Sequence, residues 1–429
     1  MSAGARFRQK KDGRERPSIR EKKAANNMEN TRASDHTHSM RTVTYALEIS
    51  LGLGFAIYCA SCSLTSAATD ASAGAANASA GAASGTAGAP SGTAGAPATA
   101  VCMGGPAPVT DPAAPIKGPC DIYALDGGPC VAAHSTVRAL YASFAGPLYQ
   151  VKKADGTTKD IVPLAPGGFA NSADQDTFCG VDSCTISIIY DQSGKGNHLT
   201  KAPPGGAKPT PGNEANAKAL PVTFSGHKVY GVHVVPGIGY RNNSPCGTAT
   251  GDNPETEYAV VDGAVFNGGC CFDYGNMETS SRDDGEGTME AVYFGKCTIW
   301  GRGAGEGPWV MGDLENGLWA GDSSPFADAK PVTSKYVTGM VKGDAAGKNH
   351  WAIKVGDAQA GALTVQFDGK RPSARYNPMR KQGAVGLGTG GDNSNAATGN
   401  FFEGLMTAAY SSDAADNAVQ ANIVAAYAQ

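Results

Sequence analysis

Short segments in which apolar and polar residues alternate recur from residue 118 to the end of the chain. Alternation at period two is typical of β-strands with one buried face, and the Gly-, Asp- and Asn-rich stretches between the segments are typical of turns. Many short strands without interleaved helical segments favour an all-β sandwich. The pattern predicts strands at residues 184–190, 227–235, 258–266, 287–294, 309–314, 335–341, 351–355, 362–367 and 401–410.

Two segments depart from this alternation. Residues 132–141 read as one helical stretch, and a hydroxyl residue is available to cap it. In residues 414–426 apolar side chains recur at helical spacing, directly after a Ser-Asp pair that can cap a helix. We therefore expect one N-terminal and one C-terminal helix beside the sheets.

The composition agrees with a turn-rich chain and adds a charge asymmetry. The 429 residues include 58 glycines and 25 prolines, which favour many turns and few long helices. Of the 35 Lys+Arg and 39 Asp+Glu, residues 1–41 carry 11 and 5, which leaves 24 and 34 for the rest. The main body is therefore acidic and offers no obvious surface for nucleic acid.

The leader has the pattern of an export signal. An apolar run of about ten residues at 49–58 is short for a membrane span and suits a signal-peptide core. The basic stretch before it is long, so Met40 or Met28 is an alternative start. Cys62 lies in a stretch that resembles a bacterial lipoprotein cleavage box, whereas ordinary cleavage after Ala67 is the rival. We expect an exported protein, either secreted or anchored to the cell surface through a lipid.

Three regions follow from these observations. Residues 1–62 form a basic leader with a signal peptide, and residues 63–117 form an Ala/Gly/Ser/Thr/Pro-rich linker that cannot bury a core. Residues 118–429 contain no second linker and are expected to fold as one domain.

Eight cysteines lie from Cys120 onward, an even number that predicts disulfides in an exported domain. Their spacing does not match zinc-binding patterns, and the 7 histidines are scattered, so we expect no metal site. Cys270 and Cys271 are adjacent. They either pair with separate partners or bond to each other in a small ring with a rigid sulfur surface.

Two acidic residues end the predicted strand at 309–314. Alternation places Met311, Asp313 and Glu315 on one face, so two carboxylates lie side by side and raise each other's pKa. A solvated outer face is the simpler interpretation. The flanking Trp and Gly residues favour a sugar site instead, because carboxylates beside an aromatic platform and bare backbone are common there.

A second acidic candidate lies in the Gly-rich stretch at 386–395. Its glycines satisfy G-x-G-x-x-G, but no helix follows, so a dinucleotide site is excluded, and the acidic ladder of a calcium loop is missing. A strand of small residues that ends at Asp392 would let a ligand approach the backbone. An ordinary Asp/Asn turn is the alternative.

Longer motifs resemble the α-L-arabinofuranosidase B catalytic domains of glycoside hydrolase family 54, over nearly all of residues 118–428. The motifs are Gly118-Pro-Cys-Asp-Ile-Tyr, Pro129-Cys-Val-Ala-Ala-His-Ser-Thr, Ile189-Tyr-Asp-Gln-Ser-Gly, Gly239-Tyr-Arg-Asn-Asn, Cys270-Cys-Phe-Asp-Tyr-Gly-Asn, Gly307-Pro-Trp, Gly390-Gly-Asp-Asn-Ser-Asn and Ala421-Asn-Ile-Val-Ala-Ala.

The resemblance implies a concanavalin-like β-sandwich of the jelly-roll type. It also implies release of terminal α-L-arabinofuranosyl residues, with retention of configuration, from plant cell-wall polymers such as arabinan and arabinoxylan. Retention needs an ionised and a protonated carboxyl roughly 5 Å apart. We expect no cofactor and a monomer.

The resemblance assigns individual roles as well. Glu315 falls at the nucleophile and Asp392 at the general acid/base. The expected substrate contacts are Asp313, Asn316, Gly317, Gly391, Cys270, Cys271 and Trp300. The implied disulfides are Cys120–Cys130, Cys179–Cys184 and Cys270–Cys271.

The chain departs from the family pattern in three respects. Gly317 stands where a second Asn is expected. No arabinose-binding module follows, so attachment to polysaccharide is expected to rest on the linker. Cys246 and Cys297 are left over, and we predict that they pair. Two alternatives stay open: a carbohydrate-binding sandwich without catalysis, and the same fold acting on a xyloside or a galactofuranoside.

Overall fold

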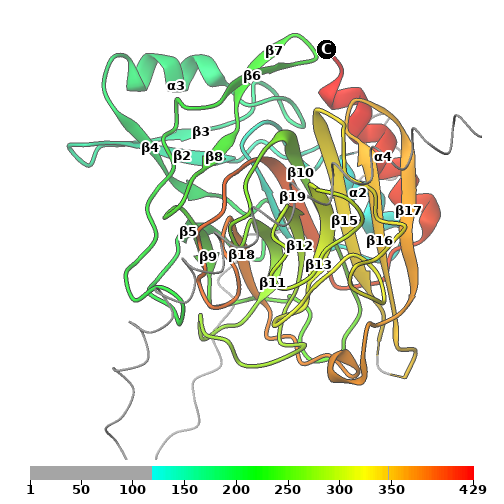
Figure 1. Cartoon of the computed structure of the whole chain (residues 1–429). Helices are drawn as coiled ribbons and strands as arrows, with labels where there is room; N and C mark the ends of the chain where they lie inside the picture. Colours follow the sequence, from blue (N-terminus) through cyan, green and yellow to red (C-terminus); the bar gives the residue numbers. More distant parts are fainter. Residues whose placement is uncertain (1–117, 346) are drawn as a thin grey trace, which may run out of the picture. The chain divides into compact units, whose positions relative to one another are not determined.

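The structure is a computed structural model that describes residues 118–345 and 347–429, and its strands form two antiparallel sheets packed face to face (Figure 1). The seven-stranded short sheet has the order β1 (Cys130–Ser135), β19 (Gly399–Thr407), β10 (Glu255–Phe266), β15 (Tyr336–Gly343), β16 (His350–Asp357) and β17 (Ala360–Lys370), with β8 (Val232–Val234) also paired to β19.

The ten-stranded long sheet has the order β14 (Leu318–Trp319), β13 (Trp309–Asp313), β12 (Glu290–Gly295), β11 (Asp273–Met277), β18 (Ala384–Leu387), β9 (Tyr240–Asn242), β5 (Leu199–Lys201), β4 (Cys184–Ile189), β2 (Tyr149–Lys153) and β3 (Thr158–Ile161). A separate hairpin consists of β6 (Pro221–Phe224) and β7 (His227–Tyr230). The helices are α2 (Pro119–Leu125), α3 (Ser172–Cys179), the 3₁₀ turn η1 (Ala374–Tyr376) and α4 (Asp413–Tyr427).

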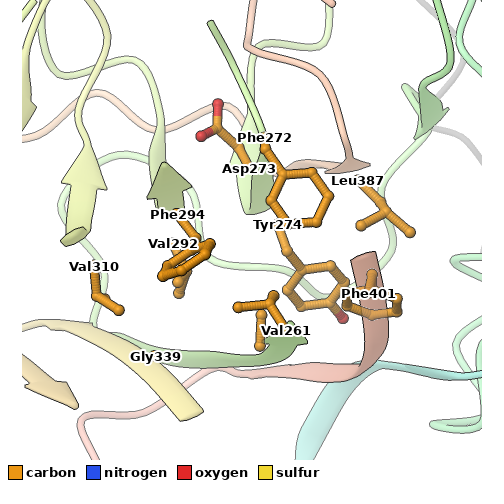
Figure 2. Close-up of a pocket in the computed structure, with 11 residues that line it drawn as sticks. Val261, Phe272, Asp273, Tyr274, Val292, Phe294, Val310, Gly339, Leu387 and Phe401 are labelled. Carbon is orange, nitrogen blue, oxygen red and sulfur yellow. The ribbon is translucent and has the colours of Figure 1, made fainter. Parts of the chain in front are cut away.

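The main core lies between the two sheets, where apolar side chains leave a void of only about 10 Å³ (Figure 2). Phe272, directly before β11, and Tyr274 on β11 reach into it beside Val292 and Phe401, whereas Figure 2 shows the carboxylate of Asp273 directed away from the aromatic rings. Successive residues of a strand point to opposite faces. The long sheet therefore has one apolar face in the core and an outer face that is free for other chemistry.

Helix α4 is tied to the short sheet by a buried ion cluster. Ser412 caps the helix by accepting a hydrogen bond from Ala415 N at 3.1 Å. One turn further on, Asp416 Oδ2 lies 2.8 Å from Lys342 Nζ on β15 and 2.6 Å from Lys354 Nζ on β16. Because Asp416 is fully buried, its two lysine partners stabilise the charge that burial alone would disfavour.

The β-sandwich prediction is confirmed, and each predicted strand segment overlaps one or two observed strands. The C-terminal helix is also confirmed. The helix predicted at 132–141 is wrong, because this segment forms β1 and pairs with β19. All six residues of β1 are buried, so pairing and burial override the helical preference of its alanines. The N-terminal helix is α2 instead, and α3 is an additional helix that the pattern did not reveal.

The structure contains the disulfides Cys120–Cys130, which joins α2 to β1, and Cys179–Cys184, which joins α3 to β4. The predicted Cys246–Cys297 pair is wrong. Cys297 is a buried free thiol packed near Tyr293 and Trp309, whereas Cys246 is disulfide-bonded elsewhere. The prediction took the two cysteines left over from Cys120 onward and ignored Cys59, Cys62 and Cys102.

The predicted leader at 1–62 and linker at 63–117 lie outside the described residues. Within the described ranges, no helix combines the length and the apolar character that crossing a bilayer requires.

We expect Asp416→Ala to lower the free energy of unfolding by about 3–5 kcal/mol, because it leaves buried Lys342 and Lys354 with only the exposed Asp413 carboxylate as counter-ion. The control is Asp413→Ala. That carboxylate also contacts Lys354, but its side chain is 75% exposed, and its loss is expected to cost about 1 kcal/mol or less. Chemical denaturation of both variants measures the difference, and equal small losses would contradict the assignment.

Candidate active site

A pocket of about 300 Å³ opens on the outer face of the long sheet. It is lined by Ala207, Cys270, Cys271, Asp283, Trp300, Asp313, Glu315, Asn316, Gly317, Gly390, Gly391, Asp392 and Ser394. Every residue that the sequence singled out for catalysis or substrate contact is in this set. Segments far apart in the chain therefore meet at one concave surface, which is the usual form of a small-molecule site.

Asp313 and Glu315 reach the pocket in different ways. Strand β13 ends at Asp313, so its alternation places Met311 and Asp313 on the outer face but does not extend to Glu315. Glu315 and Asn316 instead form a turn with positive φ angles of 62° and 56°. Asp313 Oδ1 accepts a hydrogen bond from Glu315 N at 3.1 Å, which holds this turn. Positive φ is uncommon for Glu and is often retained at functional sites.

Asp392 comes from the loop that follows β18 and also lines the pocket. Its Oδ1 atom accepts a hydrogen bond from Ser394 N at 2.8 Å. The buried guanidinium of Arg241 on β9 donates from Nη1 to Gly390 O at 2.8 Å and to Gly391 O at 2.7 Å. Arg241 therefore fixes the backbone directly before Asp392, which orients this carboxyl toward the pocket.

Carboxyl groups crowd this region. Burial raises the pKa of Asp313 to about 7, although the hydrogen bond from Glu315 N opposes the shift. Burial, followed by the charges of Asp313 and Glu278, raises the pKa of Glu315 to about 11. Burial also lowers the pKa of Arg241 to about 10, while the surrounding acids oppose that shift. The environment of the pocket thus favours protonated carboxyl groups.

One wall of the pocket is the Cys270–Cys271 disulfide, so the alternative of separate partners is excluded. Cys271 Sγ lies 3.4 Å from Asp313 Oδ2. These three side chains are close enough to surround an ion, but a sulfur in a disulfide is not the thiolate that metals bind. The arrangement fits a sulfur surface against a neutral ligand better than a metal centre.

The rim contains Trp300, which is 50% exposed, and Asn316, whose Nδ2 donates to Asp283 Oδ1 at 3.0 Å. Gly317 contributes only backbone. A Cβ atom at this position would lie 2.2 Å from Trp319 Nε1 and 2.6 Å from Tyr376 OH. The local packing therefore requires glycine here, and a side chain in place of Gly317 would have to displace the two aromatic residues.

The sequence did not single out Glu278, Asp273 or Arg241. Arg241 lies in the Gly239-Tyr-Arg-Asn-Asn motif, so the motif was a signal without an assigned role. Asp273, the first residue of β11, lies in the Cys270-Cys-Phe-Asp-Tyr-Gly-Asn motif, also without an assigned role, and Glu278 directly follows this strand. Only the structure shows that the charges of Arg241, Asp273 and Glu278 interact with Asp313 or Glu315, which line the pocket.

We expect the carboxyl groups of the pocket to lower the free energy of unfolding as pH rises. The raised pKa of Asp313 means that the folded chain binds more protons than the unfolded chain between about pH 4 and 7, so stability falls across this window. Asp313→Asn removes this effect, and the stability of the variant relative to wild type should increase by up to about 1.4 kcal/mol per pH unit. Denaturation at several pH values measures this, with exposed Asp283→Asn as control. A difference that does not vary with pH would contradict it.

Comparisons with known proteins place this geometry in context. The family model "Alpha-L-arabinofuranosidase B, catalytic" matches residues 119–428. A probable α-L-arabinofuranosidase B of Aspergillus fumigatus is 58% identical over 318 residues, which are 72% of this chain and 62% of that protein. A Trichoderma koningii protein named arabinofuranosidase/B-xylosidase is 56% identical over 316 residues, with the same coverage of 72% and 62%.

Two solved structures are similar over the same region. One is a GH54 arabinofuranosidase soaked with a cyclic sulfate inhibitor, and the other is an arabinofuranosidase in complex with arabinofuranosyl-α-1,2-xylobiose. Each has a TM-score of 0.70 and 53% identity, and covers 72% of this chain and 65% of that chain. The chain thus spans less than two thirds of the length of these relatives.

Proposed function

The chain belongs to the family of the α-L-arabinofuranosidase B catalytic domain, and on this basis we propose that it is a retaining, exo-acting glycosidase. Its substrates are terminal α-L-arabinofuranosyl residues on polysaccharides such as arabinan and arabinoxylan. The proposal rests most on one observation: Glu315 and Asp392 come from separate loops and line one pocket. A retaining glycosidase needs two such carboxyl groups.

In this mechanism Glu315 is the nucleophile and Asp392 the general acid/base. The Glu315 carboxylate forms a bond to the anomeric carbon while the bond to the leaving oxygen breaks, and Asp392 gives its proton to that oxygen. Asp392 then takes a proton from water, whose oxygen displaces Glu315 and releases the sugar. Asp313 accepts a hydrogen bond from a ring hydroxyl, and this bond strengthens as positive charge develops on the sugar.

The size and lining of the pocket support exo action on one sugar. Its volume of about 300 Å³ is at the lower end of the range for small-molecule sites. The disulfide ring supplies a rigid apolar wall, and half-exposed Trp300 offers a platform for the part of the substrate that extends out of the pocket. Branches on xylan are one suitable class, since the solved relative holds an arabinofuranosyl-xylobiose.

Two other functions remain to be compared. The Trichoderma koningii relative carries β-xylosidase in its name, so an aryl β-xyloside belongs in the assay beside an aryl α-L-arabinofuranoside. A binding module without catalysis is disfavoured, because such a module does not need a second carboxyl on the far side of the sugar.

The disulfides at Cys120–Cys130 and Cys179–Cys184 support export. The choice between secretion and a lipid anchor at Cys62, and the monomeric state, stay predictions.

We expect Glu315→Gly to reduce hydrolysis of an aryl α-L-arabinofuranoside by at least about 10³-fold, because no carboxylate remains to attack the anomeric carbon. Azide fits the space left by the side chain, and added azide should restore turnover of a substrate with a good leaving group. The product is then the glycosyl azide of inverted configuration, which NMR identifies. Glu306→Gly, at an exposed position of the same region, is the control. An unaltered rate in Glu315→Gly would exclude the nucleophile role.

For Asp392→Asn we expect a loss of about 10²–10⁴-fold on substrates with poor leaving groups, because the amide has no proton to give to the departing oxygen. Aryl glycosides with acidic phenols need little assistance and should lose less in the first step. A plot of kcat/KM against leaving-group pKa should therefore become steeper in the variant. Equal losses on every substrate would argue against proton transfer by Asp392.

A further inference from the structure

Glu278 lies beneath the pocket, directly after β11, and none of its surface is exposed. Its Oε1 atom lies 2.6 Å from Thr288 Oγ1. Its Oε2 atom has no N–H or hydroxyl donor within hydrogen-bond range among the described residues. The group that does face it is the carboxyl of Glu315, whose Oε2 atom adjoins the same space.

Gly391 makes this contact possible. A Cβ atom at position 391 would lie 1.8 Å from Glu278 Oε2 and 2.7 Å from Glu315 Oε2. The two carboxyl oxygens therefore occupy adjoining space beneath a residue that has no side chain. A pocket-lining position without a Cβ is also where a ligand approaches the backbone closely, so the contact lies directly under the expected position of the sugar.

A proton must lie between these two groups, because carboxylate oxygens only accept hydrogen bonds and two ionised groups this close repel each other. Burial raises the pKa of Glu278, in agreement with the geometry.

The other charged groups around the pair come from separate elements. Asp313 ends β13, Asp273 begins β11, and Asp392 and exposed Asp283 belong to loops at the pocket. Arg241 on β9 faces them as a cation and donates from Nη2 to the backbone oxygen of Glu278. The nearby acids disfavour a second negative charge on the Glu278–Glu315 pair, whereas Arg241 stabilises a single negative charge there. One proton shared between Glu278 and Glu315 is the state that this environment favours.

We propose that Glu278 is a positioning residue that takes the shared proton when Glu315 acts as the nucleophile. The inference rests on the proposed glycosidase function and deepens it. When the sugar binds, the proton moves from Glu315 to Glu278 Oε2, and the negative charge moves from Glu278 to Glu315, next to the carbon where positive charge develops. The proton on Glu278 then donates to Glu315 and holds its free oxygen in line for attack.

The number of protons is conserved through the proposed catalytic cycle. Glu315 forms its bond to the anomeric carbon as an anion, and the leaving oxygen receives its proton from Asp392, so Glu278 keeps the shared proton. Water then gives one proton to Asp392 and its oxygen to the sugar, which releases the Glu315 carboxylate. The shared proton can return to Glu315 once the product leaves.

The test compares Glu278→Gln, which keeps a donor toward Glu315, with Glu278→Met, which has similar length and no donor. Both are assayed for kcat/KM on an aryl α-L-arabinofuranoside across pH. We expect the Gln variant to stay within about 10-fold of wild type, and the acid limb of the Met profile to lie about one pH unit above that of the Gln variant. Glu257→Gln, a fully buried carboxyl on β10 away from the pocket, is the control and should leave the profile unchanged.

A merely structural role would lower the thermal stability of both variants and leave the acid limb in place, and that result would overturn the proposal.

A second measurement needs only the Gln variant. Infrared difference spectra on binding of arabinose should show a protonated-carboxyl band in wild type that Glu278→Gln loses, and an unchanged band would also overturn the proposal. If wild type does not hydrolyse the arabinofuranoside at all, the proposed function fails instead, so the two failures are distinguishable.

Discussion

The site depends on the position of one buried guanidinium group. Arg241 on β9 donates to the backbone oxygens of Gly390, Gly391 and Glu278, which belong to two segments more than a hundred residues apart in sequence. Backbone oxygens, unlike carboxylates, do not neutralise the cation, so the charge of Arg241 remains effective toward the acids around it. The same side chain thus orients the loop of Asp392 and offsets part of the repulsion among buried carboxyl groups.

The two faces of the long sheet lie in different environments. At the start of β11, Phe272 and Tyr274 fill the core between the sheets, while Asp273 between them points to the opposite side (Figure 2). On β13, Val310 faces the core, whereas Met311 and Asp313 lie on the outer face. Because strand residues alternate between faces, a shift of register by one residue would exchange core and site. Tight packing of the core therefore also fixes the position of the face that carries the pocket.

The density of acids in the pocket is consistent with the chemistry proposed for it. Glycoside cleavage passes through a transition state with positive charge on the sugar ring, and preorganised negative groups stabilise such charge without rearrangement. Burial raises the pKa of Glu315, Glu278, Asp313 and Asp273, so the pocket does not favour ionisation of all four carboxyl groups at once.

The sequence alone determined the features that depend on near neighbours: the strands from period-two alternation, the capped C-terminal helix, and, through motif resemblance, the residues that line the pocket. Only the tertiary structure decided that the Ala-rich segment at 130–135 is a strand, since its pairing with β19 outweighs local propensity. Only it showed that Cys297 is unpaired and that Arg241 and Glu278 belong to the site. The physical reason is that periodicity and capping act within a few residues, whereas disulfide partners, buried protons and pockets arise where distant segments meet.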